Sequence, residues 1–228
     1  MDASLRVVIA GGGTGGHVLA GVAVAEAWKS DGEVIFVGSR GGIEERLVPK
    51  AGFRLELLEV GALNRVSVKR KLLTLFQLPL SFLRSAQFIL RHRPSAVLGV
   101  GGYSSGPVLL IARVLSVLGV NRAKTAVLEQ NSVAGFTNRV LGRFVDQVFA
   151  AFPGTEPSFP GRPLRVTGNP VRSAIRRQGP PPAEPFTVFI FGGSQGAVGI
   201  NTLVLESLRH LADLKGRLEF VHQTGERD

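Results

Sequence analysis

The chain has no cysteine and, among its 228 residues, only one methionine, one tryptophan and one tyrosine. The lack of cysteine excludes disulfide bonds, thiolate metal sites and a cysteine nucleophile. There is no Asp-x-Asp pair, and the four histidines show no metal-ligand spacing, so we do not expect a diphosphate held by a metal, or any metal site. An uninterrupted apolar run of about 18 residues is also missing, so a membrane-spanning helix is not expected.

Positive charge is in excess, because 27 lysines and arginines outnumber 17 aspartates and glutamates and give a formal net charge of +10. This balance predicts an anionic partner, which is a nucleic acid, an acidic membrane surface or a phosphorylated substrate. The basic residues are not interleaved with stacking aromatics, which argues against nucleic acid. The first residues, MDASLRVV, do not resemble a signal peptide, so we expect a cytoplasmic protein.

The opening stretch Leu5–Ala20, LRVVIAGGGTGGHVLA, predicts a strand, a tight turn and a helix. Glycines let the backbone turn sharply beside a ligand, and the first N–H groups of a helix attract anions. The stretch is therefore a candidate phosphate-binding unit. Gly11, Gly13 and Gly16 fit the dinucleotide pattern G-x-G-x-x-G, whereas His17 stands where a P-loop needs lysine.

A nicotinamide-binding unit also needs an acidic residue at the end of its second strand. The strand expected at 33–37 runs instead into Gly38, Ser39 and Arg40. Arg40 could pair with a 2′-phosphate, so an NADP-dependent Rossmann enzyme is kept as an alternative. His17 instead indicates acid–base chemistry, because a helix N-terminus favours a neutral imidazole, which can accept a proton. The simpler alternative is that His17 is a surface histidine without a role.

Strands and helices continue to alternate after this unit, which is the rhythm of a parallel, doubly wound α/β sheet. A strand at 96–100 leads into a second glycine turn, GVGGYSSGP. A further strand at 125–128 delivers Glu129, Gln130 and Asn131 to the same edge of the sheet. This polar triplet is either part of a site or an ordinary loop in which Asn131 caps the next helix.

Residues 68–94 are apolar in the middle and basic at both ends. One interpretation is a helix that lies in a membrane interface, where the basic residues meet anionic head groups. The other is a pair of core helices, divided at Pro79, with a solvated basic rim. The sequence does not decide between them.

Two stretches rich in proline and glycine, at 152–163 and 179–185, predict a domain junction. Beyond them, FTVFIF and GGSQGAVGIN repeat the strand, glycine turn and helix of the opening stretch. We therefore expect an α/β protein with two Rossmann-like doubly wound domains, residues 1–168 and residues 169–228, the second incomplete. If the glycine turns of the two domains face each other, helix dipoles, N–H groups and Arg172 would stabilise the charge of a diphosphate without a metal.

Five motifs in fixed order resemble the MurG family: GGGTGGH, GGYSSGP, EQN followed by AGFTN, GNPVR and GGSQGA. The resemblance covers essentially the whole chain and implies the two-domain GT-B fold. It implies transfer of N-acetylglucosamine, with inversion, from UDP to the C4 hydroxyl of undecaprenyl-diphosphate-linked N-acetylmuramoyl pentapeptide, which converts lipid I to lipid II in peptidoglycan biosynthesis. The alternative within this fold is another transferase with a lipid acceptor.

The partners that the resemblance implies are UDP-N-acetylglucosamine, lipid I and the anionic surface of the bacterial plasma membrane at its cytoplasmic face. No cofactor and no metal are implied. The implied donor contacts are Thr14, Gly15, Gly16, Asn131, Arg172 and Ser194, with Asn201 as a further candidate. The candidates for the acceptor diphosphate are Gly13, Gly102, Tyr103 and Ser104. The implied membrane patch consists of Lys69, Arg70, Lys71, Leu72, Leu75, Phe76 and Phe82.

In the mechanism that we expect, His17 is the general base on the acceptor hydroxyl and Glu129 is the second candidate. Arg172 and the helix after Ser194 stabilise the departing UDP. Leu128 stands where some members of the family have a histidine, so no acid–base role is assigned there. The family's downstream part, with further donor contacts, is absent from the sequence, and we do not expect this chain alone to be active.

Overall fold

Seven parallel strands form the sheet of the first part of the chain in the computed structural model, which describes residues 5–58, 68–175, 179–180, 185–192 and 196–225, with backbone only for 68–77. The strand order is β3-β2-β1-β4-β5-β6-β7. The strands are β1 (Leu5–Gly11), β2 (Gly32–Ser39), β3 (Arg54–Leu58), β4 (Ala96–Gly101), β5 (Lys124–Glu129), β6 (Gln147–Ala150) and β7 (Leu164–Val166). This confirms the expected doubly wound α/β sheet.

Helices cover both faces of this sheet, which is why β1 and β2 each contain an apolar run without alternation. In β1, Val7 and Ile9 pack with α1 (Gly15–Trp28) and α2 (Glu44–Lys50). Val8 and Ala10, which point the opposite way, pack with α3 (Val68–His92) and α4 (Ser105–Val117). All four of these β1 side chains are buried. The short helices α5 (Phe136–Leu141) and η1 (Glu156–Ser158) lie in later connections.

The second part of the chain contains β8 (Phe186–Phe191), α6 (Val198–Leu208), η2 (Arg209–Leu214) and β9 (Leu218–Gln223). β8 and β9 pair in parallel in a two-stranded sheet, which is the strand, helix and strand expected at the start of a second doubly wound domain.

The chain divides into two compact units after Ile175, rather than after residue 168 as expected from the sequence. The reason is that the intervening residues bond to the first unit. The Asn169 side-chain amide donates to the Gln130 carbonyl at 3.1 Å, and the Ser173 N–H donates to Glu26 at 2.7 Å.

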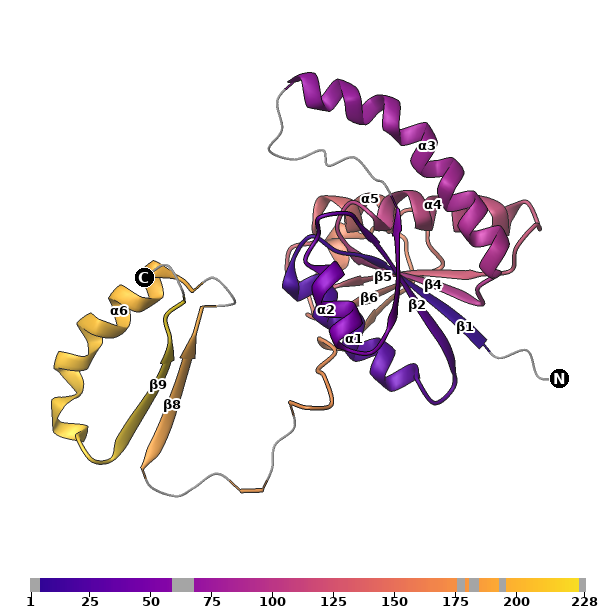
Figure 1. Ribbon diagram of the computed structural model, residues 1–228. Helices are drawn as coiled ribbons and strands as arrows, with labels where there is room; N and C mark the ends of the chain where they lie inside the picture. Colours follow the sequence, from indigo (N-terminus) through magenta and orange to yellow (C-terminus); the bar gives the residue numbers. More distant parts are fainter. Residues whose placement is uncertain (1–4, 59–67, 176–178, 181–184, 193–195, 226–228) are drawn as a thin grey trace. The chain divides into compact units, whose positions relative to one another are not determined.

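The basic, apolar stretch forms one helix, α3, and Pro79 lies inside it instead of dividing it. The C-terminal half of α3 is a core helix beside α4, because Phe88 and Ile89 are buried against the sheet (Figure 1). Leu83 on the other side of the helix is 56% exposed. Among the residues that the structure describes, no helix is long and apolar enough to cross a membrane.

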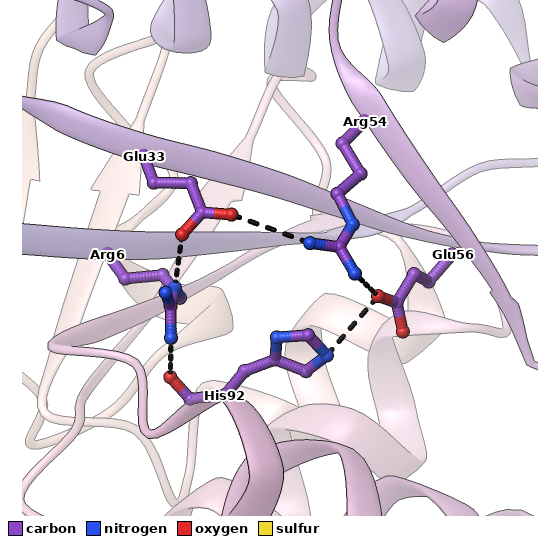
Figure 2. Close-up of polar contacts among 5 residues, drawn as sticks. All are labelled: Arg6, Glu33, Arg54, Glu56 and His92. Atoms are coloured by element: carbon purple, nitrogen blue, oxygen red, sulfur yellow. Dashed lines mark hydrogen bonds and ion pairs between the residues drawn. The ribbon is translucent and has the colours of Figure 1, made fainter.

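A polar network ties the end of α3 to the strands at the edge where β1, β2 and β3 begin. Figure 2 shows Arg6 between Glu33 and the carbonyl of His92, and Glu56 between Arg54 and the His92 imidazole. The His92 Nε2 lies 3.2 Å from the Glu56 carboxylate. The network lies towards the amino ends of these strands, away from the glycine turns that follow β1 and β4.

A second polar contact joins α4 to the start of β6. Asp146 accepts hydrogen bonds from the Thr125 N–H at 2.9 Å and from its hydroxyl at 3.0 Å, and it pairs with Arg113. Burial acts to raise the pKa of the Asp146 carboxyl, but the Thr125 hydrogen bonds and the charges of Arg113 and Lys124 outweigh it. The pKa of Asp146 is therefore lowered below its ordinary value of 3.8.

Candidate functional site

The two glycine turns of the first unit meet at the point where the strand order reverses. β1 pairs with β2 on one side and with β4 on the other, and open α/β sheets bind ligands at the carboxyl ends of such strands. The Gly12 N–H donates to the Gly101 carbonyl at 3.1 Å. Gly102 has a φ of +86°, and a Cβ there would lie 2.4 Å from the Gly12 carbonyl oxygen. Only glycine allows the two turns to approach this closely.

A cavity of about 420 Å³ opens over the joined turns. It brings together six residues that the sequence pointed to, namely Gly13, Thr14, His17, Gly102, Tyr103 and Glu129. Its remaining walls are Gly12, Gly101, Gly135, Phe136, Thr137 and Asn138. The last four belong to the AGFTN motif, at the start of α5 and in the loop before it, but none of them was singled out as a site residue.

His17 lies in the first turns of α1, with its imidazole across the second glycine turn. Its Nδ1 is 3.3 Å from the Gly12 carbonyl oxygen. Because a carbonyl can only accept, the neutral ring carries its hydrogen on Nδ1 in this contact, and Nε2 keeps its lone pair. A Cβ at Gly101 would lie 2.9 Å from that Nε2. The geometry therefore suits His17 as a proton acceptor.

Glu129, the second candidate for the base, is engaged on both carboxylate oxygens. One oxygen accepts from the Asn131 N–H and side-chain amide at 2.9 and 3.0 Å, and the other from the Gly135 N–H and the Asn138 amide at 3.0 Å. The residue is 1% exposed. This arrangement fits a carboxylate that fixes the loop after β5 better than a mobile proton acceptor.

Asn131 does not cap the next helix, which is the alternative that the sequence left open. α5 begins at Phe136 with Gly135 in the N-cap position, and no side chain makes the cap hydrogen bond there. Asn131 bonds to Glu129 instead. Ser104, a candidate for the acceptor diphosphate, is 1% exposed and is not among the residues that line the cavity.

A second cavity, of about 350 Å³, lies on the other side of the start of α1. It collects three of the expected donor contacts, Gly16, Asn131 and Arg172, whereas Thr14 lines the first cavity. Gly15 begins α1. Gln130 and Asn169, which also line the second cavity, are joined by a hydrogen bond. The position of Asn169 beside Gln130 was not evident from the sequence.

The remaining expected donor contacts lie in the second unit. Asn201 is 4% exposed, and its side-chain amide donates to the Thr224 carbonyl at 2.9 Å, so it ties α6 to the end of β9. Ser194 lies outside the described residues, as do the side chains of Lys69, Arg70, Lys71, Leu72, Leu75 and Phe76 in the expected membrane patch. Phe82, the last member of that patch, is half-buried.

Glu44 is the site residue that the sequence did not reveal. Its carboxylate lies beneath the first glycine turn at the end of β2, with no exposed surface. It accepts from the N–H groups of Gly13 and Ser39 at 3.0 and 2.9 Å, and from the Ser39 hydroxyl at 3.0 Å. A carboxylate thus does stand at the end of the second strand, but it is buried and bound to backbone. It is not available to a ribose, which argues against an NAD enzyme.

No cluster of three or more histidine, aspartate or glutamate side chains that could hold a metal occurs in the described part of the chain. The titratable side chains on the walls of the first cavity are His17, Tyr103 and Glu129, and no lysine or arginine is among them. An anion in this cavity would be bound by backbone N–H groups and by the N-termini of α1 and α4.

Comparison with known proteins identifies the fold and the motifs. A family model described as the glycosyltransferase family 28 N-terminal domain matches residues 7–150. The chain belongs to glycosyltransferase family 28. The model of the family's C-terminal domain matches residues 187–228. These matches confirm that the chain carries parts of two domains.

Two relatives of this family 28 chain are named UDP-N-acetylglucosamine–N-acetylmuramyl-(pentapeptide) pyrophosphoryl-undecaprenol N-acetylglucosamine transferase. The protein of Anaeromyxobacter sp. (strain Fw109-5) is 46% identical over 98% of the chain, and that of Syntrophus aciditrophicus (strain SB) is 45% identical over 99%. The chain spans 59% and 62% of their lengths.

A solved structure agrees with these sequence matches. The crystal structure of MurG from Acinetobacter baumannii superposes with a TM-score of 0.72 and 30% identity, over 98% of this chain and 62% of that one. The resemblance to the MurG family is confirmed, and so is the two-domain glycosyltransferase fold.

Proposed function

We propose that the chain is the larger part of an inverting transferase that converts lipid I to lipid II. The donor is UDP-N-acetylglucosamine, and the acceptor is the C4 hydroxyl of undecaprenyl-diphosphate-linked N-acetylmuramoyl pentapeptide. The names of the relatives support these substrates. The observation that carries the proposal is His17, which lies in the cavity over the glycine turns with Nδ1 held by the Gly12 carbonyl and Nε2 free to accept a proton.

The chemistry is a direct displacement at the anomeric carbon. His17 Nε2 takes the proton of the acceptor hydroxyl while its oxygen forms the new bond to the anomeric carbon. The bond from that carbon to the diphosphate breaks, and its electron pair leaves with UDP. Arg172 and the N-terminus of α1, which line the second cavity, stabilise the negative charge of the leaving group.

The acceptor diphosphate is bound without a metal or a cofactor. Gly102 and Tyr103 line the first cavity at the start of α4, and α1 begins on its other side. The unpaired N–H groups of both helix N-termini attract the two phosphates. Gly13 lines the same cavity, but its own N–H is bound to Glu44 and does not contribute.

The protein binds the anionic membrane surface at the cytoplasmic face through α3 and its neighbours. An apolar cavity of about 160 Å³ between α3, α4 and α5 is lined by Phe82, Leu110 and Leu141. It shares Tyr103, Phe136 and Thr137 with the first cavity, so an apolar surface adjoins the site for the acceptor's diphosphate. Basic residues at the start of α3 add attraction to anionic lipid.

The test uses the chain extended, after Asp228, by the remaining C-terminal sequence of the Anaeromyxobacter relative. Transfer of labelled N-acetylglucosamine to a short-chain lipid I analogue is measured for the parent, for His17→Ala and for His210→Ala. Loss of a general base reduces turnover by about 100- to 10,000-fold, with donor binding retained. His210 is an exposed histidine in η2, and its replacement leaves turnover unchanged.

Three outcomes would contradict the proposal. Unchanged turnover in His17→Ala removes the histidine from its role. Transfer to lipid diphosphates that lack the muramoyl pentapeptide, at the same rate, indicates another lipid-acceptor transferase. Binding of NADPH, detected by its fluorescence, together with no transfer, favours the nicotinamide enzyme.

A further inference from the structure

The Gly12–Gly13 peptide group is held at both ends by side chains from different elements. Its N–H, on Gly13, donates to the Glu44 carboxylate at 3.0 Å. Its C=O, on Gly12, lies 3.3 Å from His17 Nδ1. A peptide group is planar and rigid, so the position of one end fixes the direction of the other. Glu44 in α2 and His17 in α1 are therefore connected through a single peptide unit.

The space around the Glu44 carboxylate is shaped for it. A Cβ on Gly12 would lie 2.1 Å from a Glu44 oxygen, and a Cβ on Gly42 would lie 2.4 Å from the carboxylate carbon. A Cβ on Gly38 would lie 2.5 Å from the Glu44 Cγ. Three glycines from three segments thus leave room for this one buried side chain. The buried position of the Glu44 carboxylate is therefore a specific feature of this packing, and not a chance orientation of an acid at a helix terminus.

We propose that Glu44 is a positioning residue for His17 and acts through the Gly12–Gly13 peptide. The carboxylate turns the peptide so that its carbonyl faces the imidazole, and this carbonyl keeps the ring hydrogen on Nδ1. Hydrogen bonds in such a chain polarise one another, so the bond at the N–H end strengthens the bond at the C=O end. In Ser-His-Asp triads a carboxylate holds the histidine directly, whereas here one peptide stands between them. The inference rests on the proposed function only in that His17 is the base there.

The test reads the His17 tautomer and does not depend on transfer. The 228-residue chain is labelled with ¹⁵N-histidine, and the His17 ring signals are assigned by their loss in His17→Ala. At alkaline pH, where the ring is neutral, the parent is expected to have Nδ1 at a protonated and Nε2 at an unprotonated position. In Glu44→Gln, the amide nitrogen opposes one of the backbone donors, and both ring signals are expected to shift towards intermediate positions.

Glu45→Gln is the matched control. Glu45 is the next residue, also in the first turn of α2, and its carboxylate accepts from the Gly41 N–H at 2.8 Å on the exposed side. Its replacement removes the same charge and a similar bond, and the His17 signals are expected to stay at the parent positions. Unchanged His17 signals in folded Glu44→Gln, or equal shifts in both variants, would overturn the proposal.

A second measurement applies whether or not Glu44→Gln folds. Gly13 is exposed, yet its N–H is expected to exchange slowly with solvent because it points to the buried carboxylate. In His17→Ala, the peptide loses its partner at the carbonyl, and exchange of the Gly13 N–H is expected to become several-fold faster. Fast exchange in the parent, or the same rate in both proteins, refutes the connection. If His17→Ala transfers sugar normally, the base role fails while these signals still report the connection.

Discussion

Glu129→Gln distinguishes a carboxylate that holds a loop from one that takes a proton. The carboxylate accepts four hydrogen bonds, two on each oxygen, whereas a glutamine amide has one oxygen and one NH₂ group. In either orientation of the amide, two donors lose their acceptor and face another donor. With Glu129 1% exposed, each lost bond costs about 1–3 kcal/mol, so we expect a destabilisation of roughly 2–6 kcal/mol.

Urea unfolding followed by tryptophan fluorescence measures this change in the first unit alone. Trp28, at the end of α1, is the single tryptophan of the chain and packs against the core of that unit. Glu33→Gln is the control, because Glu33 is half-buried and pairs with Arg6 at the opposite edge of the sheet. Loss of such a pair costs about 0–1 kcal/mol. A loss below about 1 kcal/mol in Glu129→Gln, together with abolished transfer by the extended protein, would refute the structural role and restore Glu129 as the base.

Three further predictions concern the stability of the first unit. Gly102→Ala forces a Cβ against backbone at a φ of +86° and is expected to lower the free energy of unfolding by about 2–4 kcal/mol in the same urea assay. Gly106→Ala, in open space at the start of α4, is expected to be neutral or slightly stabilising. Ile89→Ala, which empties a fully buried position on α3, is expected to cost about 2–5 kcal/mol, while Leu83→Ala, at an exposed position of the same helix, changes the urea midpoint little. The pKa of Asp146 is lowered because its hydrogen bonds and cationic neighbours outweigh burial. The ionised Asp146 therefore stabilises the folded state above its ordinary pKa of 3.8, and this stabilisation is lost as the pH falls through the lowered value. Asp146→Asn should therefore lose less stability than the parent between about pH 5 and pH 3.

The strands with two buried faces were predictable from the sequence. Val7, Val8 and Ile9 follow one another without a polar residue, and only a sheet covered on both faces buries all three. β6 lies in a stretch for which no strand was predicted, because Gln147–Ala150 is only four residues long. Of the two interpretations left open for residues 68–94, the division at Pro79 does not occur, since α3 runs through it and its C-terminal half is fixed by burial against the sheet.

The site was predictable where it directly follows a strand or a glycine turn, whereas Glu44 in α2 was not predictable. His17 and Gly102 were found because each follows directly on a strand and a glycine cluster. Glu44 and Glu45 are adjacent acids at the start of a helix, where any acid is favourable. Only the fold distinguishes them, since Glu44 has no exposed surface and Glu45 is exposed. The packing of α2 against β2, rather than any local pattern, decides which of the two carboxylates reaches the turn.

Gly12 and Gly13 of the opening motif are therefore explained by contacts within the protein, and not by contact with a phosphate. Gly12 is required by the Glu44 carboxylate, and the N–H of Gly13 is bound to that carboxylate. Gly102 is required by the close approach of the second turn to the first. An anion in the cavity must then use the N–H groups at the starts of α1 and α4, and those of α1 begin with Gly15 and Gly16 of the motif itself. The turn serves the ligand indirectly, by placing two helix N-termini and the His17 imidazole around one cavity.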